Sequence, residues 1–347
     1  MAERLVALDG LRGIAALAVV SFHVLARGGG LAEPFSQAYL AVDFFFLLSG
    51  YVLARTYEVR FNEGLSGSRY FLARISRLAP SILLGVVLGA AVSLWQAPGT
   101  PIWGAVLLQA LMLPVFWEQV MFPLNIPQWS LFMELIANAV QGAIGRRLAS
   151  WMLAGLVLAG TAGLLALLID HKKIAGGGEW WSFWVGLARV SFSFFGGVAI
   201  WRLQTGGRLR LPAAPAWTAY LALLVVLVTP IPWLPGVHDF VVVTLIWPAI
   251  LVIAINARPP TAFGPAWEFL GEVSYPLYAI HSPLLILAAP FVPAVMPARW
   301  LAAAVIVASC TLLAWLVARF YDAPLRRLLR LQTSRLRHNP IDVGGNV

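Results

Sequence analysis

Arg12 and His23 interrupt one long apolar run near the start of the chain, LDGLRGIAALAVVSFHV. They are eleven residues apart, about three turns of an α-helix, so both side chains are expected on one helix face. At about 1.5 Å per residue, roughly 16 Å of helix separates them. Ionisable groups inside apolar membrane segments are costly and are therefore functional candidates by default.

Asp43 lies near the start of the next apolar run, after the short connector 28–37. If the two runs cross a membrane as neighbouring helices, His23 and Asp43 share a depth. A carboxylate that accepts a hydrogen bond from one imidazole nitrogen fixes the tautomer and leaves the other nitrogen as a general base. The alternative is a buried polar pair that only holds two helices together. The residues alone leave both interpretations open.

Two later segments carry further polar groups. Glu134, in QWSLFMEL, is expected near the depth of His23, and GEVSYPLYAIHSP places Tyr275, Tyr278 and His281 at helical spacing. Singly, each Tyr or His is more readily a packing residue. Together, four apolar segments that bring polar groups to one depth predict a polar cavity open to the outside.

Three arginines follow the second apolar run in SRYFLARISRLAP, which we expect to be a cytoplasmic loop. Arg74 and Arg77 are three residues apart and share a face of any helix there, with Arg69 just before them. Arginine pairs bind phosphates through bidentate hydrogen bonds. The alternative is that these arginines only orient the protein in the membrane or contact lipid headgroups.

The composition shows what must position these residues. The chain has 347 residues, is 60% hydrophobic and only 11% charged, and has a mean hydropathy of +0.82. A soluble domain carries roughly 25% charged residues, so lipid must cover this one. The net charge of +9 is scattered between apolar runs, which argues against a nucleic-acid partner. A single cysteine, Cys310, excludes an internal disulfide and a cysteine cluster, and no HExxH spacing occurs, so no metal is predicted.

We predict an all-α membrane protein of about ten helical spans, each of about 20 apolar residues. The first is too long for a cleavable signal peptide. The segment 99–127, broken by four prolines, is expected to be re-entrant or interfacial. The spans are predicted near 8–26, 38–55, 79–97, 128–146, 150–169, 181–201, 214–230, 239–257, 269–289 and 299–319.

The charge distribution orients these spans. With the N-terminus in the cytoplasm, eighteen of the 24 Lys and Arg residues lie inside and four outside, a strong positive-inside asymmetry. Both termini are then predicted to be cytoplasmic. Residues 1–322 form the membrane domain, and 323–347 form a short basic cytoplasmic tail.

Five segments, in order, resemble the acyltransferase-3 family, which includes O-antigen acetylases and nodulation-factor acylases. They are LDGLRGIAALAVVSFHV, AVDFFFLLSGYVLA, FLARISRLAP, QWSLFMEL and GEVSYPLYAIHSP. The resemblance covers the chain from Leu8 to about Asp322. It departs slightly at Tyr51, where Phe is commoner, and at Leu47 and Leu48 before Ser49.

The resemblance implies transfer of an acyl group, by default acetyl, from cytoplasmic acyl-CoA to a hydroxyl of an extracytoplasmic glycan or lipid-linked saccharide. It places Arg12, His23, Asp43 and Glu134 in the functional core. We expect the donor to be bound by Arg74, Arg77, Arg69 and Ser49, and the acceptor by Trp129, Tyr275, Tyr278 and His281.

In this hypothesis His23, oriented by Asp43, takes the proton of the acceptor hydroxyl as it attacks the thioester. A covalent acyl-His or acyl-Ser49 intermediate remains an alternative. Two other classes of protein also place charge in a membrane. One is a proton- or ion-coupled transporter, and the other is a non-catalytic membrane assembly protein.

Overall fold

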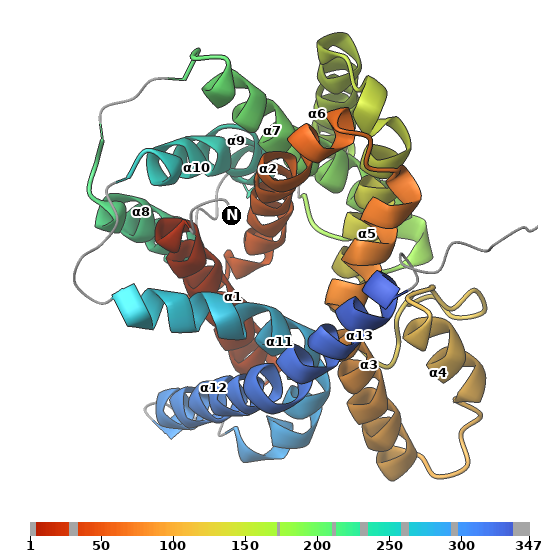
Figure 1. Cartoon of the computed structure of the whole chain (residues 1–347). Helices are drawn as coiled ribbons and strands as arrows, with labels where there is room; N and C mark the ends of the chain where they lie inside the picture. The colour runs from red at the N-terminus through yellow and green to blue at the C-terminus, as the bar shows by residue number, and fades with distance from the viewer. Residues whose placement is uncertain are drawn as a thin grey trace, which may run out of the picture.

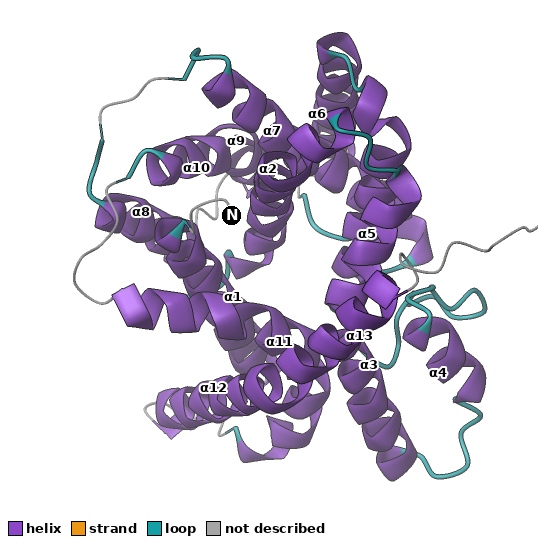
Figure 2. Cartoon of the chain, in the orientation of Figure 1, coloured by secondary structure: helices purple, strands orange, loops and turns teal. Residues whose placement is uncertain are grey.

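The computed structural model describes residues 5–27, 34–171, 174–209, 213–229, 235–257, 264–292 and 298–335. Figure 1 shows a bundle of helices arranged around a common centre. Within these ranges the chain is helical apart from loops and one isolated β-bridge, between Val120 and Glu179 (Figure 2). The predicted all-α class is confirmed.

The helices follow the apolar runs of the sequence. They are α1 (Val6–Arg27), α2 (Ala41–Asn62), α3 (Gly67–Gln96), α4 (Trp103–Ala110), α5 (Gln128–Ile144), α6 (Ser150–His171), α7 (Phe183–Thr205), α8 (Ala216–Val228), α9 (Pro235–Val241), α10 (Trp247–Ile255), α11 (Gly264–Ala288), α12 (Ala298–Val317) and α13 (Ala323–Arg335). Short π-helical turns, Val242–Ile246 and Ala318–Asp322, join α9 to α10 and α12 to α13.

Eight helices in the described ranges are long and apolar enough to cross a membrane. The remaining two predicted spans correspond to α5, of 17 residues, and α8, of 13. In the segment 99–127 the single helix is α4, of eight residues. Eight residues rise only about 12 Å, against a hydrocarbon core of about 30 Å. The segment therefore does not cross the membrane as one helix. This agrees with the prediction that it is re-entrant or interfacial.

One boundary differs from the prediction in a way that matters for the site. The segment with Arg74 and Arg77 is not a loop, because α3 begins at Gly67 and runs for 30 residues. Ser66 caps this helix by accepting a hydrogen bond from the backbone N–H of Arg69. Hydropathy located only the apolar part of α3, and the helix continues beyond it.

Contacts between helices fix their directions. Arg12 reaches Ser274, and the ring of His23 lies against that of His281, so α1 and α11 run in the same direction. α3 runs in this direction too, because the hydroxyl of Tyr275 donates to the carbonyl of Leu78 and, further along both helices, Gly85 packs against the carbonyl of Ala279. We call the side of the bundle where α1, α3 and α11 begin the N-terminal face, and the other side the far face.

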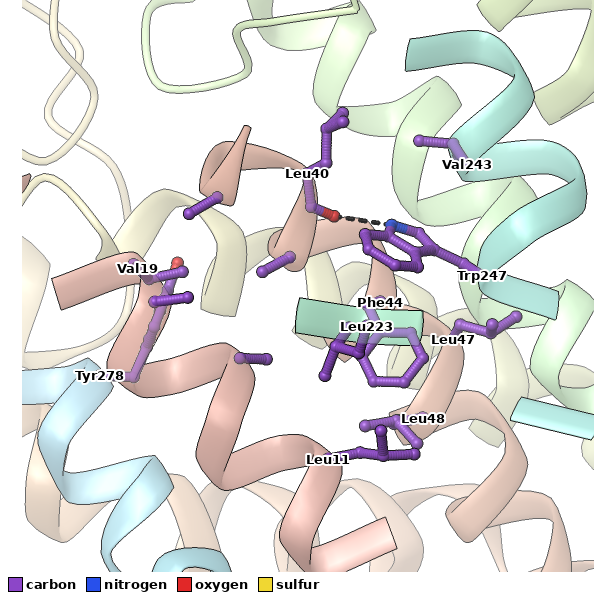
Figure 3. Packing of buried hydrophobic residues seen from close by; sticks show 14 of the residues in the cluster. Leu11, Val19, Leu40, Phe44, Leu47, Leu48, Leu223, Val243, Trp247 and Tyr278 are labelled. Atoms are coloured by element: carbon purple, nitrogen blue, oxygen red, sulfur yellow. Dashed lines mark hydrogen bonds between the residues drawn. The ribbon is translucent and has the colours of Figure 1, made fainter. Parts of the chain in front are cut away.

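Close packing places α2. A Cβ atom on Gly50 would overlap the carbonyl oxygen of Phe194, and one on Gly197 would overlap that of Leu47, so small residues let α2 and α7 approach closely. At the far face, the buried indole of Trp247 donates to the carbonyl of Leu40 at 2.9 Å, just before α2 begins (Figure 3). These contacts fix the orientation of the helix that carries Asp43 and Ser49.

Candidate active site

A cavity of about 470 Å³ lies among α1, α2, α3, α5 and α11, close to the point where α13 begins. Its lining follows α2 from Val42 to Tyr57, which is about 22 Å of helix at 1.5 Å per residue. Much of the wall is apolar, and the polar part converges from several helices, as is typical of ligand sites. The charged lining residues are Arg12, Arg74, Arg77, Arg326, Glu134, Glu272 and Asp322.

A second hollow, of about 670 Å³, lies between α1 and α12. Its lining contains no ionisable side chain, and Ser21 and Thr311 bring its only hydroxyl groups. It offers apolar packing without a group for acid–base chemistry. The cavity with the arginines is therefore the candidate active site.

Glu134 joins three helices at the wall of this cavity. Its Oε1 accepts a hydrogen bond from Ser49 Oγ of α2 at 2.5 Å and one from Arg74 Nη2 of α3 at 3.1 Å. Both members of the ion pair are largely buried. The sequence placed Glu134 beside His23 and Asp43, but its partners are Arg74 and Ser49.

Arg12 is held by α11 on the opposite wall. Its Nε donates to Ser274 Oγ at 2.8 Å, and its Nη2 donates to the carbonyl of Gly271 at 2.7 Å. Asp9, one turn earlier on α1, lies 3.0 Å from the same nitrogen. These contacts hold the guanidinium in place while its side chain stays about one-third exposed.

Two tyrosines of α11 also line the cavity. The Tyr275 hydroxyl donates a hydrogen bond to the carbonyl of Leu78, whereas the Tyr278 hydroxyl lies 2.7 Å from Ser130 Oγ of α5. The Tyr278 ring packs against Phe45 of α2 on one side and against His281 on another. Tyr278 thus lines the cavity and also contacts His281, whereas neither His23 nor His281 is part of the lining.

His23 and His281 face each other, with ring centroids 5.3 Å apart. His281 is fully buried, and its Nδ1 lies 2.8 Å from the carbonyl of Tyr278. A carbonyl only accepts, so this nitrogen carries the proton and Nε2 is the acceptor of a neutral ring. Arg12 and His23 both contact α11, which confirms that they share a face of α1.

Asp43 has a different partner from the one the sequence suggested. Both of its carboxylate oxygens accept from Arg189 of α7, the closest contact being Nη2 to Oδ2 at 2.6 Å. Arg189 also donates to the carbonyl oxygens of Gly176 and Tyr39. The expected His23–Asp43 pair is therefore wrong. A full positive charge on a neighbouring helix is a stronger partner for a buried carboxylate than a neutral imidazole.

Two other predicted residues lie away from the cavity lining. Trp129 packs under the Arg189 guanidinium, 5.4 Å from its ring centroid, and against Gly177 and Gly178. Arg69 is exposed in the first turn of α3. Donor or acceptor binding by either residue remains a prediction, whereas Ser49, Arg74, Arg77, Tyr275 and Tyr278 all line the cavity.

The structure adds residues that sequence reasoning missed. Ser274 and Ser130 hold Arg12 and Tyr278, and Asp322 and Arg326 line the cavity beside α13. Serines in apolar helices could not be recognised from the sequence as site residues. Arg189 could have been, because a cation inside a predicted span is a functional candidate. Among the described residues, no group of three or more His, Cys, Asp or Glu side chains could hold a metal ion.

The family model for the acyltransferase domain matches residues 5–319. The chain belongs to the acyltransferase-3 family. It is thus a membrane acyltransferase, and the cavity described above lies almost entirely within the matched residues.

Three known proteins are similar in sequence. Protein 2 in the picA locus of Rhizobium radiobacter is 38% identical over 42% of this chain and 84% of its own length. The putative membrane-bound transacylase BcsY of Komagataeibacter xylinus is 26% identical over 81% of this chain and 73% of its own. The peptidoglycan O-acetyltransferase OatA of Listeria monocytogenes is 29% identical, over 26% of this chain and 14% of its own. No solved structure matches the chain.

Proposed function

We propose that the protein transfers an acyl group, by default acetyl, from cytoplasmic acyl-CoA to a hydroxyl of an extracytoplasmic glycan or lipid-linked saccharide. The observation that carries this proposal is the cavity, which has arginines toward the N-terminal face and extends along α2 toward the far face. The positive-inside asymmetry supports a cytoplasmic N-terminal face, and we propose that the membrane is a bacterial inner membrane. The name of OatA, a peptidoglycan O-acetyltransferase, supports acyl transfer to a cell-surface polymer, and that of BcsY, a putative membrane-bound transacylase, supports acyl transfer at a membrane.

The donor fits this cavity by the placement of its charged and uncharged parts. Coenzyme A carries phosphates at one end and a long, mostly uncharged pantetheine arm at the other. Arg77, exposed at the N-terminal side of the lining, and Arg12 attract the phosphates. The arm then lies along the apolar wall of α2, past Ser49 and Glu134, and brings the thioester toward Tyr278.

His23 supplies the base in this scheme. The acceptor oxygen bonds to the thioester carbonyl carbon, and His23 takes the hydroxyl proton. The carbon–sulfur bond then breaks, and the proton passes to the departing thiolate. His281 takes the orienting role that the sequence gave to Asp43, because its ring lies against His23 and its Nδ1 is fixed by the Tyr278 carbonyl.

The test uses inverted membrane vesicles supplied with acetyl-CoA labelled in the acetyl group. In the wild type, label accumulates in the glycan fraction, and purified protein binds acetyl-CoA saturably. We expect His23→Ala to lower transfer at least 100-fold, since general bases contribute about 10²–10⁴-fold, and to leave binding unchanged. His238→Gln, which changes a histidine on α9, is the matched control and keeps transfer.

Two results would end the proposal. One is wild-type transfer by His23→Ala. The other is no acetyl-CoA binding at millimolar concentration by protein that elutes as a single folded species. The second result would instead favour the transporter or assembly classes, neither of which needs a coenzyme.

A further inference from the structure

The C-terminal helix α13 begins where a π-helical turn, Ala318–Asp322, follows α12. In Figure 1 this helix crosses in front of α3 rather than continuing away from the bundle. Such π-turns often mark functional positions in helices. Here the turn brings Asp322 and Arg326 into the lining of the cavity. The family model ends at residue 319, so both residues lie beyond the matched segment.

Asp322 fixes this arrangement. Its Oδ1 accepts from Ser81 Oγ of α3 at 3.1 Å, and its Oδ2 lies 2.6 Å from Arg326 Nη2. The Asp322 side chain is almost fully buried, whereas that of Arg326 is 27% exposed. Asp322 therefore ties α13 to α3 and holds the guanidinium of Arg326 at the edge of the cavity.

The arginines of the cavity differ in how their charge is balanced. Arg12, Arg74 and Arg326 pair with Asp9, Glu134 and Asp322, respectively. Arg77 makes no ion pair with any described residue, and the positive charges of Arg12, Arg74 and Arg326 act on it as well as the negative charge of Glu134. Positive charges gathered in this way, one of them unpaired, favour a bound anion.

We propose that Arg326 of α13, together with Arg77 of α3, binds the phosphate groups of the acyl donor, so that the C-terminal helix forms one wall of the donor site. The assignment rests on the proposed function, which supplies the donor. It adds a binding residue outside the family domain. It also gives the basic tail a role beyond orienting the protein in the membrane.

The adjacent residue offers a matched control. Arg327 carries the same charge on the same helix, but it is exposed and does not line the cavity. Acetyl-CoA affinity is measured by titration calorimetry on full-length protein in phosphatidylcholine nanodiscs. We expect Arg326→Gln to weaken binding at least tenfold, as expected for a lost charge-assisted hydrogen bond, and Arg327→Gln to leave it unchanged. S-acetylpantetheine, which lacks the phosphates, should bind both variants as it binds the wild type.

A second variant tests whether the effect of Arg326→Gln comes from a folding defect. Arg326→Gln leaves the buried Asp322 carboxylate without its cation, so Asp322→Asn/Arg326→Gln is measured alongside, and the same tenfold loss is expected. Equal affinity for acetyl-CoA in the wild type and in either folded variant overturns the inference. So does an equal loss in Arg327→Gln, which would show a general surface charge effect.

Lipid headgroups are the other source of phosphate. If they are the ligand of Arg326, the variant loses thermal stability only in phosphatidylglycerol nanodiscs and keeps wild-type acetyl-CoA affinity, which also overturns the inference. Wild-type protein that binds no acetyl-CoA defeats the proposed function itself. Wild-type binding with an unaffected Arg326→Gln defeats only the role of α13.

Discussion

Two of the ion pairs among the described residues join helices in surroundings that differ. Asp43 and Arg189 join α2 to α7, with side chains 0% and 2% exposed, and both carboxylate oxygens accept from the guanidinium. Arg74 and Glu134 join α3 to α5 through one contact of 3.1 Å, and both line the cavity. The first pair is closed, whereas the second has space beside it for a ligand.

The difference separates two reasons for placing charge in a membrane. A closed, fully hydrogen-bonded pair fixes helices relative to one another and leaves no atom for a substrate. An ion pair at a cavity wall keeps hydrogen-bonding capacity that a ligand can use. On this comparison we predict that Asp43 positions α2 and that Glu134 and Arg74 belong to the reaction site.

The largest effect is expected from breaking the closed pair. Asp43→Ala leaves Arg189 charged and buried, which costs about 3–5 kcal/mol of folding free energy. We expect little monodisperse protein after size-exclusion chromatography in detergent and a lower Tm in what remains.

The control for that prediction replaces the pair rather than breaking it. Asp43→Leu/Arg189→Met removes both charges at similar volume, and such replacements are often close to neutral. We expect it to recover most of the folded yield. An Asp43→Ala protein with wild-type Tm and no activity would instead show that Asp43 acts in the reaction, as the sequence suggested.

The helices were predictable because each span must bury about 20 apolar residues in lipid. All ten predicted runs coincide with helices, and the segment with four prolines does not cross the membrane as one helix. The start of α3 was missed, because the turns that carry Arg74 and Arg77 are too polar for a hydropathy signal while remaining helical.

Which helices touch could not be predicted from the order of the spans. The His23–Asp43 pair assumed that α1 and α2 are the main neighbours. In the structure α1 packs chiefly against α11 and α2 against α7, which brings His281 to His23 and Arg189 to Asp43. Periodicity within one helix did succeed, since it placed Arg12 and His23 on one face.

An intermediate effect is expected at the open pair. Glu134→Gln keeps an oxygen that accepts from Ser49 but removes the charge that pairs with Arg74. Truncating one member of a buried charge pair costs about 2–5 kcal/mol. Because the cavity lets water reach Arg74, we expect most of the loss in activity: kcat about 100-fold lower in the vesicle assay, with Tm within a few degrees of wild type.

Two outcomes would remove the distinction between the pairs. A Glu134→Gln protein that fails to fold would place Glu134 in the same structural role as Asp43. Wild-type kcat would show that the charge at this wall is not used in the reaction.

The smallest effect is expected at Ser49, and it also tests the chemistry. Its hydroxyl donates to Glu134 at 2.5 Å, so Ser49→Ala removes one hydrogen bond to a charged acceptor and leaves the ion pair with Arg74 in place. A net loss of about 1.5 kcal/mol, the lower end for a hydrogen bond to a charged group, corresponds to a rate about tenfold lower. If Ser49 instead forms a covalent acyl intermediate, alanine abolishes transfer. A loss of about tenfold in the labelled-acetyl assay, with no acyl adduct on Ser49 by mass spectrometry, therefore supports direct transfer and gives Ser49 the role of holding Glu134 in place.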